Sequence, residues 1–315
     1  MLFEGLKGDE VVDSWTIYSV GGGALANEAS RLETPRSIYP LSTISEIKEW
    51  CYHEGKTFWE YVSDCEGPEI WDYLDTVWET MCATIQRGLN NDGVLPGGLK
   101  VARKASTYWV KSKSYTDSLS SRAKIYAYAL ATSEENASGG TVVTAPTCGS
   151  SGVMPAVLYH LSTSRNFLRI RILRALATAG LFGNVAKTNS SISGAEVGCQ
   201  GEVGVACAMA AAAACQLFGG TPSQIEYAAE MGLEHHLGLT CDPVCGLVQV
   251  PCIERNAYAA ARALDANLYS AFTDGGHRVS FDRVVEVMKQ TGHDLPSIYK
   301  ETGEGGLARE YDPDK

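Results

Sequence analysis

The segment SSISGAEVGCQGE (190–202) is followed by an alanine-rich run and then by EHHLGLTCDPVCGLVQVPCIERN (234–256). Cysteine, histidine, acidic and glycine residues stand side by side in both segments, with few ordinary surface residues between them. This composition is typical of a site built from loops. We therefore take Lys187 to Asn256 as the part of the chain around which the fold is organised.

Three cysteines in this stretch, Cys199, Cys241 and Cys252, are candidate metal ligands. They are separated by 42 and 11 residues, which excludes a compact CxxC motif and requires the loops to converge by folding. Each cysteine lies beside glycine or proline, which indicates loop backbone. Converging thiolates can hold a soft metal or an iron–sulfur cluster. A free cysteine is also often only a small buried hydrophobe, and spacing alone leaves both interpretations open.

Composition sets the class of protein. The chain has 315 residues, a net charge of −11 and a pI of about 5.1, which argue against nucleic-acid and anionic-membrane partners. The start MLFEGLKGDE lacks the apolar core of a signal peptide. The alanine-rich run after Gly201 is too short for a membrane span and predicts a buried helix. Ten cysteines without a secretory signal favour metal or thiol chemistry in a reducing compartment, so we expect the cytoplasm.

The predicted fold is mainly α, with a short β segment before a helical domain. The stretch VVDSWTIYSV (11–20) favours a strand that ends at Gly21–Gly23. Helical periodicity begins at the capping box of Thr43 and Glu46. The expected division is a β segment at 1–28, a linker at 29–42, a helical catalytic domain at 43–308 and a mobile tail at 309–315. Further helices are expected at 70–89, 121–133, 153–161, 167–182, in the alanine-rich run after 201, at 222–236, 253–272 and 281–290.

Two other groups are candidates for the site. In TAPTCGSSG (144–152), hydroxyl and glycine residues precede an apolar helix, and the free N–H groups of a helix N-terminus suit a substrate carboxylate. A plain turn with an N-cap is the alternative. The adjacent His235 and His236 point to opposite sides of a helix and cannot both bind one ion. Their closeness in sequence to Cys241 makes at least one of them a candidate site residue.

Five segments of the chain, taken in order, carry a resemblance: GGTVVTAPT (139–147), SISGAEVGCQGEVGVACAMAAA (191–212), GLEHHLGLTCDPV (232–244), GLVQVPCIERNA (246–257) and YKETGEGGLA (299–308). They closely resemble the catalytic α part of the iron–sulfur L-serine dehydratases, over roughly residues 90–308. The same family has the words FEG…YSVGGG at the end of an upstream β domain, so the resemblance implies that this chain begins in the last strands of a β domain that is otherwise absent.

Elimination of water from serine needs a Lewis acid on the hydroxyl oxygen and a base at Cα. The resemblance implies that Cys199, Cys241 and Cys252 hold a [4Fe–4S] cluster with one open iron, that pyruvate and ammonia are the products, and that no pyridoxal phosphate is used. The candidate catalytic residues are Ser193, Glu196, His235 and His236. The candidate substrate-binding residues are Thr144, Thr147, Cys148, Gly149, Ser150, Ser191, Arg255 and Asn256.

This chain departs from the family pattern at two positions. Cys148 stands where the family typically reads TAPTNG, and Cys245 follows CDPV where a small residue is typical. Either thiol is a candidate fourth cluster ligand, a role played in some members by a C-terminal cysteine, whereas this chain ends Asp314-Lys315. Alternatively they mark a changed substrate, with L-cysteine losing sulfide, or they are neutral substitutions. All three interpretations stay open.

The general base is not evident in the sequence. In the resembled family an SHTxGP motif of the β domain contributes a histidine to the site, and no such motif occurs here. We therefore expect a β subunit or upstream domain to supply it, and we expect an oligomer. Three functions stay open: an L-serine ammonia-lyase, an L-cysteine desulfidase on the same scaffold, and a non-enzymatic role as a structural metal domain or as a regulatory partner that retains the scaffold. A catalytically incomplete subunit that needs a β partner is a further alternative.

Overall fold

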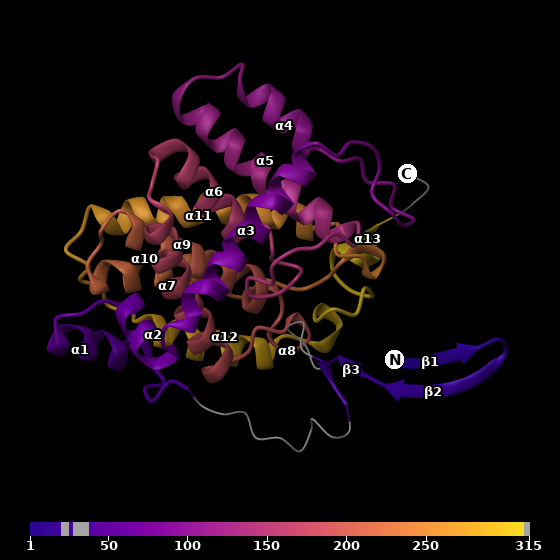
Figure 1. Cartoon of the computed structure of the whole chain (residues 1–315), viewed down its shortest axis with the longest axis horizontal. Helices are drawn as coiled ribbons and strands as arrows, with labels where there is room; N and C mark the ends of the chain where they lie inside the picture. The colour runs from indigo at the N-terminus through magenta and orange to yellow at the C-terminus, as the bar shows by residue number, and fades with distance from the viewer. Residues whose placement is uncertain (20–24, 28–37, 312–315) are drawn as a thin grey trace.

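The computed structural model describes residues 1–19, 25–27 and 38–311, and within them the chain is mainly α-helical, as predicted (Figure 1). The strands of the N-terminal part are β1 (Leu2–Lys7), β2 (Glu10–Thr16), β3 (Tyr18–Ser19) and β4 (Leu25–Ala26). The helices are α1 (Ile44–Glu54), α2 (Phe58–Glu66), α3 (Glu69–Leu89), α4 (Ala105–Ser112), α5 (Asp117–Ala137), α6 (Val153–Arg165), α7 (Arg169–Asn189), α8 (Gly194–Val197), α9 (Val205–Leu217), α10 (Pro222–Glu234), α11 (Cys252–Ala271), α12 (Phe281–Asp294) and α13 (Leu307–Glu310).

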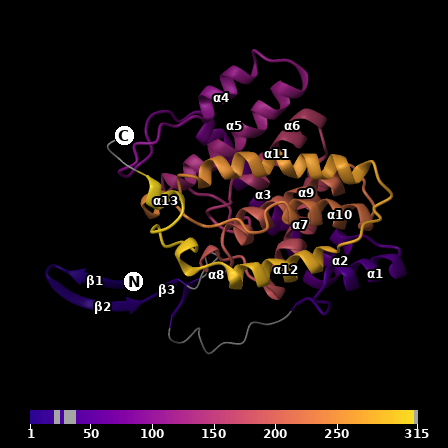
Figure 2. The same cartoon turned by 180° about the vertical axis from the view of Figure 1, so that it is seen from behind.

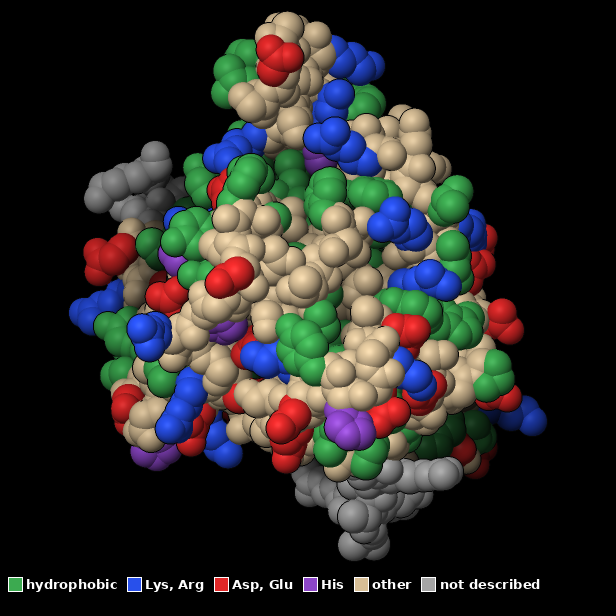
Figure 3. Space-filling model, turned by 90° about the vertical axis from the view of Figure 1, so that its left-hand side faces the viewer, with side chains coloured by type: hydrophobic (Ala, Val, Ile, Leu, Met, Phe, Trp, Pro, Cys, Tyr) green, Lys and Arg blue, Asp and Glu red, His purple; other side chains and the backbone are tan. Residues whose placement is uncertain are grey.

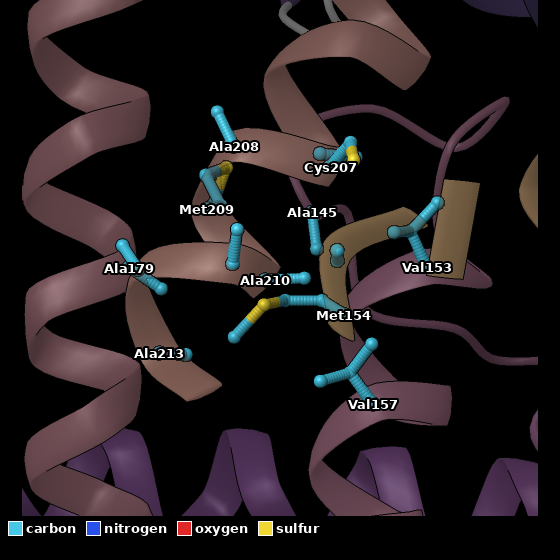
Figure 4. Packing of buried hydrophobic residues seen from close by; sticks show 14 of the residues in the cluster. Ala145, Val153, Met154, Val157, Ala179, Cys207, Ala208, Met209, Ala210 and Ala213 are labelled. Carbon is cyan, nitrogen blue, oxygen red and sulfur yellow. The ribbon is translucent and has the colours of Figure 1, made fainter. Parts of the chain in front are cut away.

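Helix α9 forms the centre of the core. Its alanine-rich sequence is almost wholly buried, as predicted, and α6, α7, α10 and α11 pack around it (Figures 1 and 4). Small side chains let the neighbouring helices come close: a Cβ added at Gly232 of α10 would lie 3.0 Å from the Cα of Ala208. None of the helices in the described parts of the chain has the length and apolarity needed to cross a membrane.

Local sequence signals set the helix starts. Thr43 and Thr221 each accept a hydrogen bond from the backbone N–H three residues on, and both capping boxes are complete. The apolar stripe predicted for 70–89 is confirmed in α3, where Leu74, Met81 and Ile85 are buried. Capping oxygens therefore fix where α1 and α10 begin, and burial of one face holds α3.

Several predicted helix bounds need correction: α6 continues to Arg165 and α12 to Asp294, beyond the predicted ends at 161 and 290. Helix α5 begins at Asp117 rather than at 121, and the short α4 before it was not predicted. The first backbone N–H groups of α4, at Lys104 and Ala105, donate to the Glu134 carboxylate at 2.7 and 3.2 Å. Because Glu134, which caps α4, lies 29 or 30 residues away in sequence, no local pattern predicts this helix. The helix predicted at 167–182 runs from Arg169 to Asn189.

The N-terminal residues form a β-hairpin, which Figures 1 and 2 show beside the helical body. Strands β1 and β2 pair antiparallel, with Leu2 opposite Thr16, and the strand predicted at 11–20 is broken at Ile17. The glycines at 21–23, residues 28–37 of the predicted linker, and 312–315 of the predicted tail lie outside the described residues. Helix α13 continues to Glu310, across the predicted boundary at 308.

Candidate active site

The three candidate cysteines come from separate elements that meet at one end of the helical body. Cys199 directly precedes a π-helical turn, η2 (Gln200–Gly204), Cys241 lies after α10, and Cys252 is the first residue of α11. The fully buried Gln200 side chain joins the first two segments. Its amide nitrogen donates to the Val197 carbonyl, and its amide oxygen accepts from the Gly238 N–H at 2.9 Å.

The C-terminal glycine-rich segment closes against the same place. The Cys241 N–H donates to the Tyr299 carbonyl at 2.8 Å, and the Glu301 N–H donates to the Cys241 carbonyl at 2.8 Å. Asp242 holds the next turn, since its Oδ2 accepts from the Leu307 N–H at 2.9 Å. The segment from Tyr299 to Leu307 therefore lies against Cys241 and Asp242.

The thiols of Cys199 and Cys241 are in contact and buried. Their mutual hydrogen bond lowers the pKa of Cys199 and raises that of Cys241. Burial raises the pKa of Cys252 to about 12, and the charge of Cys199 adds to this effect. The Arg255 guanidinium offsets negative charge here and helps to lower the pKa of Cys199. The structure thus brings the three cysteines together, which a shared site would need; their role as ligands stays a prediction.

Glu202, which the sequence analysis did not select, contributes a half-buried carboxylate to this site. Its Oε1 accepts from the Thr147 hydroxyl at 2.8 Å, and its Oε2 lies 3.8 Å from Cys241 Sγ. Burial raises the pKa of Glu202 to about 7. Because Glu202 follows Cys199 by three residues, about one helical turn, its position in CQGE was the available signal.

Glu301 is a second carboxylate that was not predicted. Its Oε1 lies 4.0 Å from Cys241 Sγ, and burial raises its pKa. One ligand atom each from Glu202, Cys241 and Glu301 lie within 4.8 Å of one another, a spacing that suits a metal ion. The Glu301 residue is exposed, so the site reaches solvent on this side.

Gly194 leaves the space between these groups open. A Cβ added there would lie 2.6 Å from Glu301 Oε1, 2.9 Å from Glu202 Oε2 and 3.1 Å from Cys241 Sγ. Real Cβ atoms do not approach oxygen this closely, so a side chain at this position would displace the site groups. The site therefore contains a small cradle that depends on a glycine.

The predicted substrate loop lies beside Glu202. Thr147 and Ser150 are buried and their hydroxyls are 3.1 Å apart, while Thr144 and Cys148 are exposed. A Cβ added at Gly149 would lie 3.3 Å from Glu202 Oε1. Burial raises the pKa of Cys148, and the charge of Glu202 adds to this effect.

Asn256 and Arg255 hold the surrounding backbone. The Asn256 amide nitrogen donates to the Gly149 carbonyl at 2.7 Å and to the Cys252 carbonyl at 2.9 Å, and its oxygen accepts from the Gly152 N–H at 2.9 Å. The Arg255 guanidinium donates to the Thr240 carbonyl at 2.6 Å and to Asp242 at 3.2 Å. Both predicted binding residues thus hold parts of the site in place by hydrogen bonds to backbone groups, and Arg255 also binds the Asp242 carboxylate.

The predicted catalytic residues are spread over a wider area. Ser193 is buried at the start of α8, where its N–H donates to the Ser191 hydroxyl at 3.1 Å, whereas Glu196 is exposed. His235 and His236 line a separate cavity of about 170 Å³ with Arg262 and Asp265. Within the described ranges, no hydrogen bond joins either histidine to the three cysteines, and burial lowers the pKa of His236 to about 4.

Cys245, the other candidate fourth ligand, is exposed on a 3-10 turn, η3 (Val244–Gly246). Its backbone has φ of 55°, in the left-handed region that glycine normally occupies. Cys148, the first candidate, lies directly before Gly149 in the loop beside Glu202. Neither role is settled by this placement, and both stay predictions.

Residues 23–308 match the family model described as the serine dehydratase alpha chain. The chain belongs to this family. It is 45% identical to an L-serine dehydratase of Streptomyces coelicolor, in an alignment that covers 96% of this chain and 69% of that protein. It is also 45% identical to L-serine dehydratase 1 of Escherichia coli, with 98% and 71% covered, and 43% identical to the L-serine dehydratase of Haemophilus influenzae, with 93% and 68% covered.

The side chains of this serine dehydratase alpha chain suit an iron–sulfur cluster. The buried thiols of Cys199 and Cys241 and the half-buried thiol of Cys252 lie together, and Cys241 borders the space that a Cβ at Gly194 would fill. The Arg255 guanidinium beside them favours the thiolate form that ligation requires. Two carboxylates lie at the same place. The donor set is therefore compatible with a cluster bound by three cysteines.

Proposed function

We propose that this chain is the catalytic part of an L-serine ammonia-lyase, which removes water from L-serine and yields pyruvate and ammonia. The observation that carries the proposal is the convergence of Cys199, Cys241 and Cys252 beside the Glu202 carboxyl. The relatives named above are all L-serine dehydratases, which supports the same reaction.

We propose that these three cysteines hold a [4Fe–4S] cluster, as the resemblance implies. When bound, such a cluster supplies a Lewis acid at the iron that has no protein thiolate. Burial keeps the ligands away from water, and Arg255 offsets part of the negative charge that the thiolates bring. In this proposal the reaction requires no pyridoxal phosphate.

The chain's own groups bind the substrate and handle protons. In this proposal the Thr147 and Ser150 hydroxyls and the start of α6 bind the serine carboxylate, because a helix N-terminus presents free N–H groups to an anion. Asn256 keeps that loop in place through Gly149 and Gly152. Glu202, with a pKa of about 7, can hold a proton on Oε2 near neutral pH and deliver it to the departing hydroxide.

The test is an anaerobic titration of the reconstituted chain with L-serine, followed by Mössbauer spectroscopy. We expect the signal of one iron site to shift when serine is added. The matched variants are Cys252→Ser, which should lose iron, and Cys65→Ser, a half-buried cysteine on α2 that should retain it. An unchanged spectrum with serine, in a chain that carries its full iron content, would contradict the proposed function.

A β subunit or an upstream β domain completes the site in this proposal and supplies the SHTxGP histidine. The apolar side chains of the β1–β2 hairpin support it, since Leu2, Leu6, Val12 and Trp15 are all more than half exposed. A two-stranded hairpin is marginally stable by itself, so another sheet is expected to cover it. If the reconstituted chain alone deaminated serine at an ordinary enzymatic rate, this part of the proposal would be wrong.

L-cysteine desulfidation is a second candidate, favoured by the position of Cys148 in the substrate loop next to Glu202. A sulfur leaving group suits iron, and exchange of one atom is decided by pocket shape. Sulfide released from L-cysteine faster than pyruvate forms from L-serine would select this function. We expect the enzyme in the cytoplasm, which the ten free thiols support.

A further inference from the structure

A second cavity, of about 920 Å³, lies between the α4–α5 hairpin and the helical body. Its walls come from the first half of α5, the second half of α6, the residue after α9 and the second half of α11. Asn267 on its wall follows Cys252 by 15 residues along α11, which is about 22 Å of helix. This cavity is therefore separate from the cysteine site.

The cavity wall carries more positive than negative charge, although the whole chain has a net charge of −11. Arg122, Lys124 and Arg165 line it, against Asp117 and Asp265. Arg122 is neutralised, because its Nη2 lies 3.0 Å from Asp265 Oδ1. Figure 3 shows the hairpin above the body, with Lys and Arg side chains near its base.

Two of these cations have no acidic partner within the described residues, namely Lys124 and Arg165. Both lie close enough to His160 to lower its pKa, after burial, to about 4. The imidazole is therefore neutral near pH 7, and its Nε2 is 2.9 Å from the Ser121 hydroxyl. The cavity thus gathers two unpaired positive charges around an uncharged, hydrogen-bonding histidine.

The wall also offers hydrogen-bond donors and one acceptor that has no partner among the described residues. Helix α5 begins here with Asp117 and Ser118, and the N-cap Thr116 makes no side-chain capping bond, so first-turn N–H groups are available to an anion. Asn267 is only 6% exposed, and its Oδ1 has no hydrogen-bond partner among the described residues. A buried polar atom left without a partner destabilises the folded state, so a ligand that donates a hydrogen bond to it gains binding energy.

We propose that this cavity binds a small organic anion, a carboxylate or a phosphate, that also carries a hydrogen-bond donor. The anionic group lies between Lys124, Arg165 and the first turn of α5. The donor group reaches Asn267. This assignment is independent of the cysteine chemistry and concerns a site about four turns further along α11.

Calorimetric titration of the full chain with inorganic phosphate and, separately, with L-lactate tests the proposal. We expect saturable binding of at least one probe, weakened by added salt. Lys124→Met or Arg165→Gln should weaken it by about tenfold, since a hydrogen bond to a charged group contributes about 1.5–3 kcal/mol. Asn267→Leu should weaken lactate more than phosphate if the hydroxyl is the donor.

Two controls separate this site from other binding. Lys111→Met, an exposed lysine of α4 outside the cavity, should leave the affinity unchanged. Cys252→Ser should also leave it unchanged, which excludes lactate binding at the cysteine site. Saturation by phosphate alone or by lactate alone identifies the preferred anion. Absence of saturable binding by both, or equal affinities for the chain and its Lys124→Met and Arg165→Gln variants, would overturn the proposal.

Discussion

The side-chain amide of Asn256 donates to the carbonyl oxygen of Gly149 at 2.7 Å and so ties the substrate loop to the first turn of α11. The same amide nitrogen reaches the carbonyl of Cys252, one of the three site cysteines, at 2.9 Å. Loop and cysteine are thus fixed by a single group. The sequence predicts Asn256 as a substrate-binding residue. In the structure, its amide bonds to the backbone of the loop that carries other candidate substrate-binding residues.

Replacing Asn256 by alanine should therefore disturb the substrate loop more than the overall fold. We expect a loss of about 1–3 kcal/mol in the free energy of unfolding, because Gly152 N–H and Gly149 C=O lose their partner in a buried setting. The KM for serine should rise. Urea unfolding and steady-state kinetics measure both effects. Asn136→Ala, on α5, is the control, and equal behaviour of the two variants would contradict the role given to Asn256.

Glu202→Gln tests the carboxyl without changing its shape. Thr147 can still donate to the amide oxygen, so we expect normal folding and a fall in kcat of roughly 10²–10⁴, typical for loss of an acid–base group. Pyruvate formation is the measurement. Glu196→Gln is the matched variant: the sequence predicts a catalytic role for Glu196, whereas its exposure predicts little change. A larger effect at Glu196 than at Glu202 would reverse our assignment.

Gly194→Ala should exclude the cluster. The new methyl group would lie within 3.1 Å of Glu301, Glu202 and Cys241, where the cradle has no spare room. Iron and sulfide analysis after anaerobic reconstitution should show a large loss of both. Gly180→Ala in α7 is the control, since a Cβ there meets nothing within 4 Å and should stabilise the helix by roughly 0.5–1 kcal/mol. Full iron content in Gly194→Ala would show that the cradle is not needed.

The stability of the chain should depend on pH through Glu230 of α10. Burial raises the pKa of Glu230 to about 7, and the nearby Glu234 and Glu226 add to the effect. The folded state therefore binds a proton that the unfolded state has already released, so stability is highest below the ordinary pKa of 4.5 and falls as the pH rises to about 7. Glu230→Gln should remove this fall and stabilise the chain at pH 8 by about 1–3 kcal/mol.

The measurement is the thermal midpoint of both proteins at pH 5 and pH 8. We expect the two midpoints of wild type to differ by more than those of Glu230→Gln. The exposed Glu286→Gln on α12 serves as the comparison for a carboxylate on the surface. Parallel pH profiles for wild type and Glu230→Gln would show that Glu230 does not titrate in this range.

Much of the fold follows from local signals in the sequence. The capping boxes at Thr43 and Thr221, the stripe in α3 and the alanine-rich α9 each act over a few residues, so they can be read without tertiary structure. Helix α4 could not be predicted because its cap is Glu134, and the exact start of α5 depends on packing that the sequence does not reveal.

The site divides in the same way. The loop settings of the cysteines allowed them to converge. Which of Glu196 and Glu202 reaches the site, however, depends on how the chain turns between the two residues. Gly198, with φ of 75°, ends α8 and turns the chain, and the π-helical turn then widens the spacing before Glu202 enters the site. Such a change of direction has no reliable signature in one sequence. Glu301 is 60 residues from Cys241 and could be placed only by the folded chain.

The two main-chain hydrogen bonds between Cys241 and residues 299–301 also determine when the site can form during synthesis of the chain. A chain that leaves the ribosome from its N-terminus has Cys199, Cys241 and Cys252 available long before Glu301 is synthesised. The nascent thiols then lack the 299–301 segment that bonds to the backbone of Cys241, and the Glu301 carboxylate that borders its thiol. Closure of the site is accordingly among the last steps in the making of this protein, completed only when nearly all of the described chain is present.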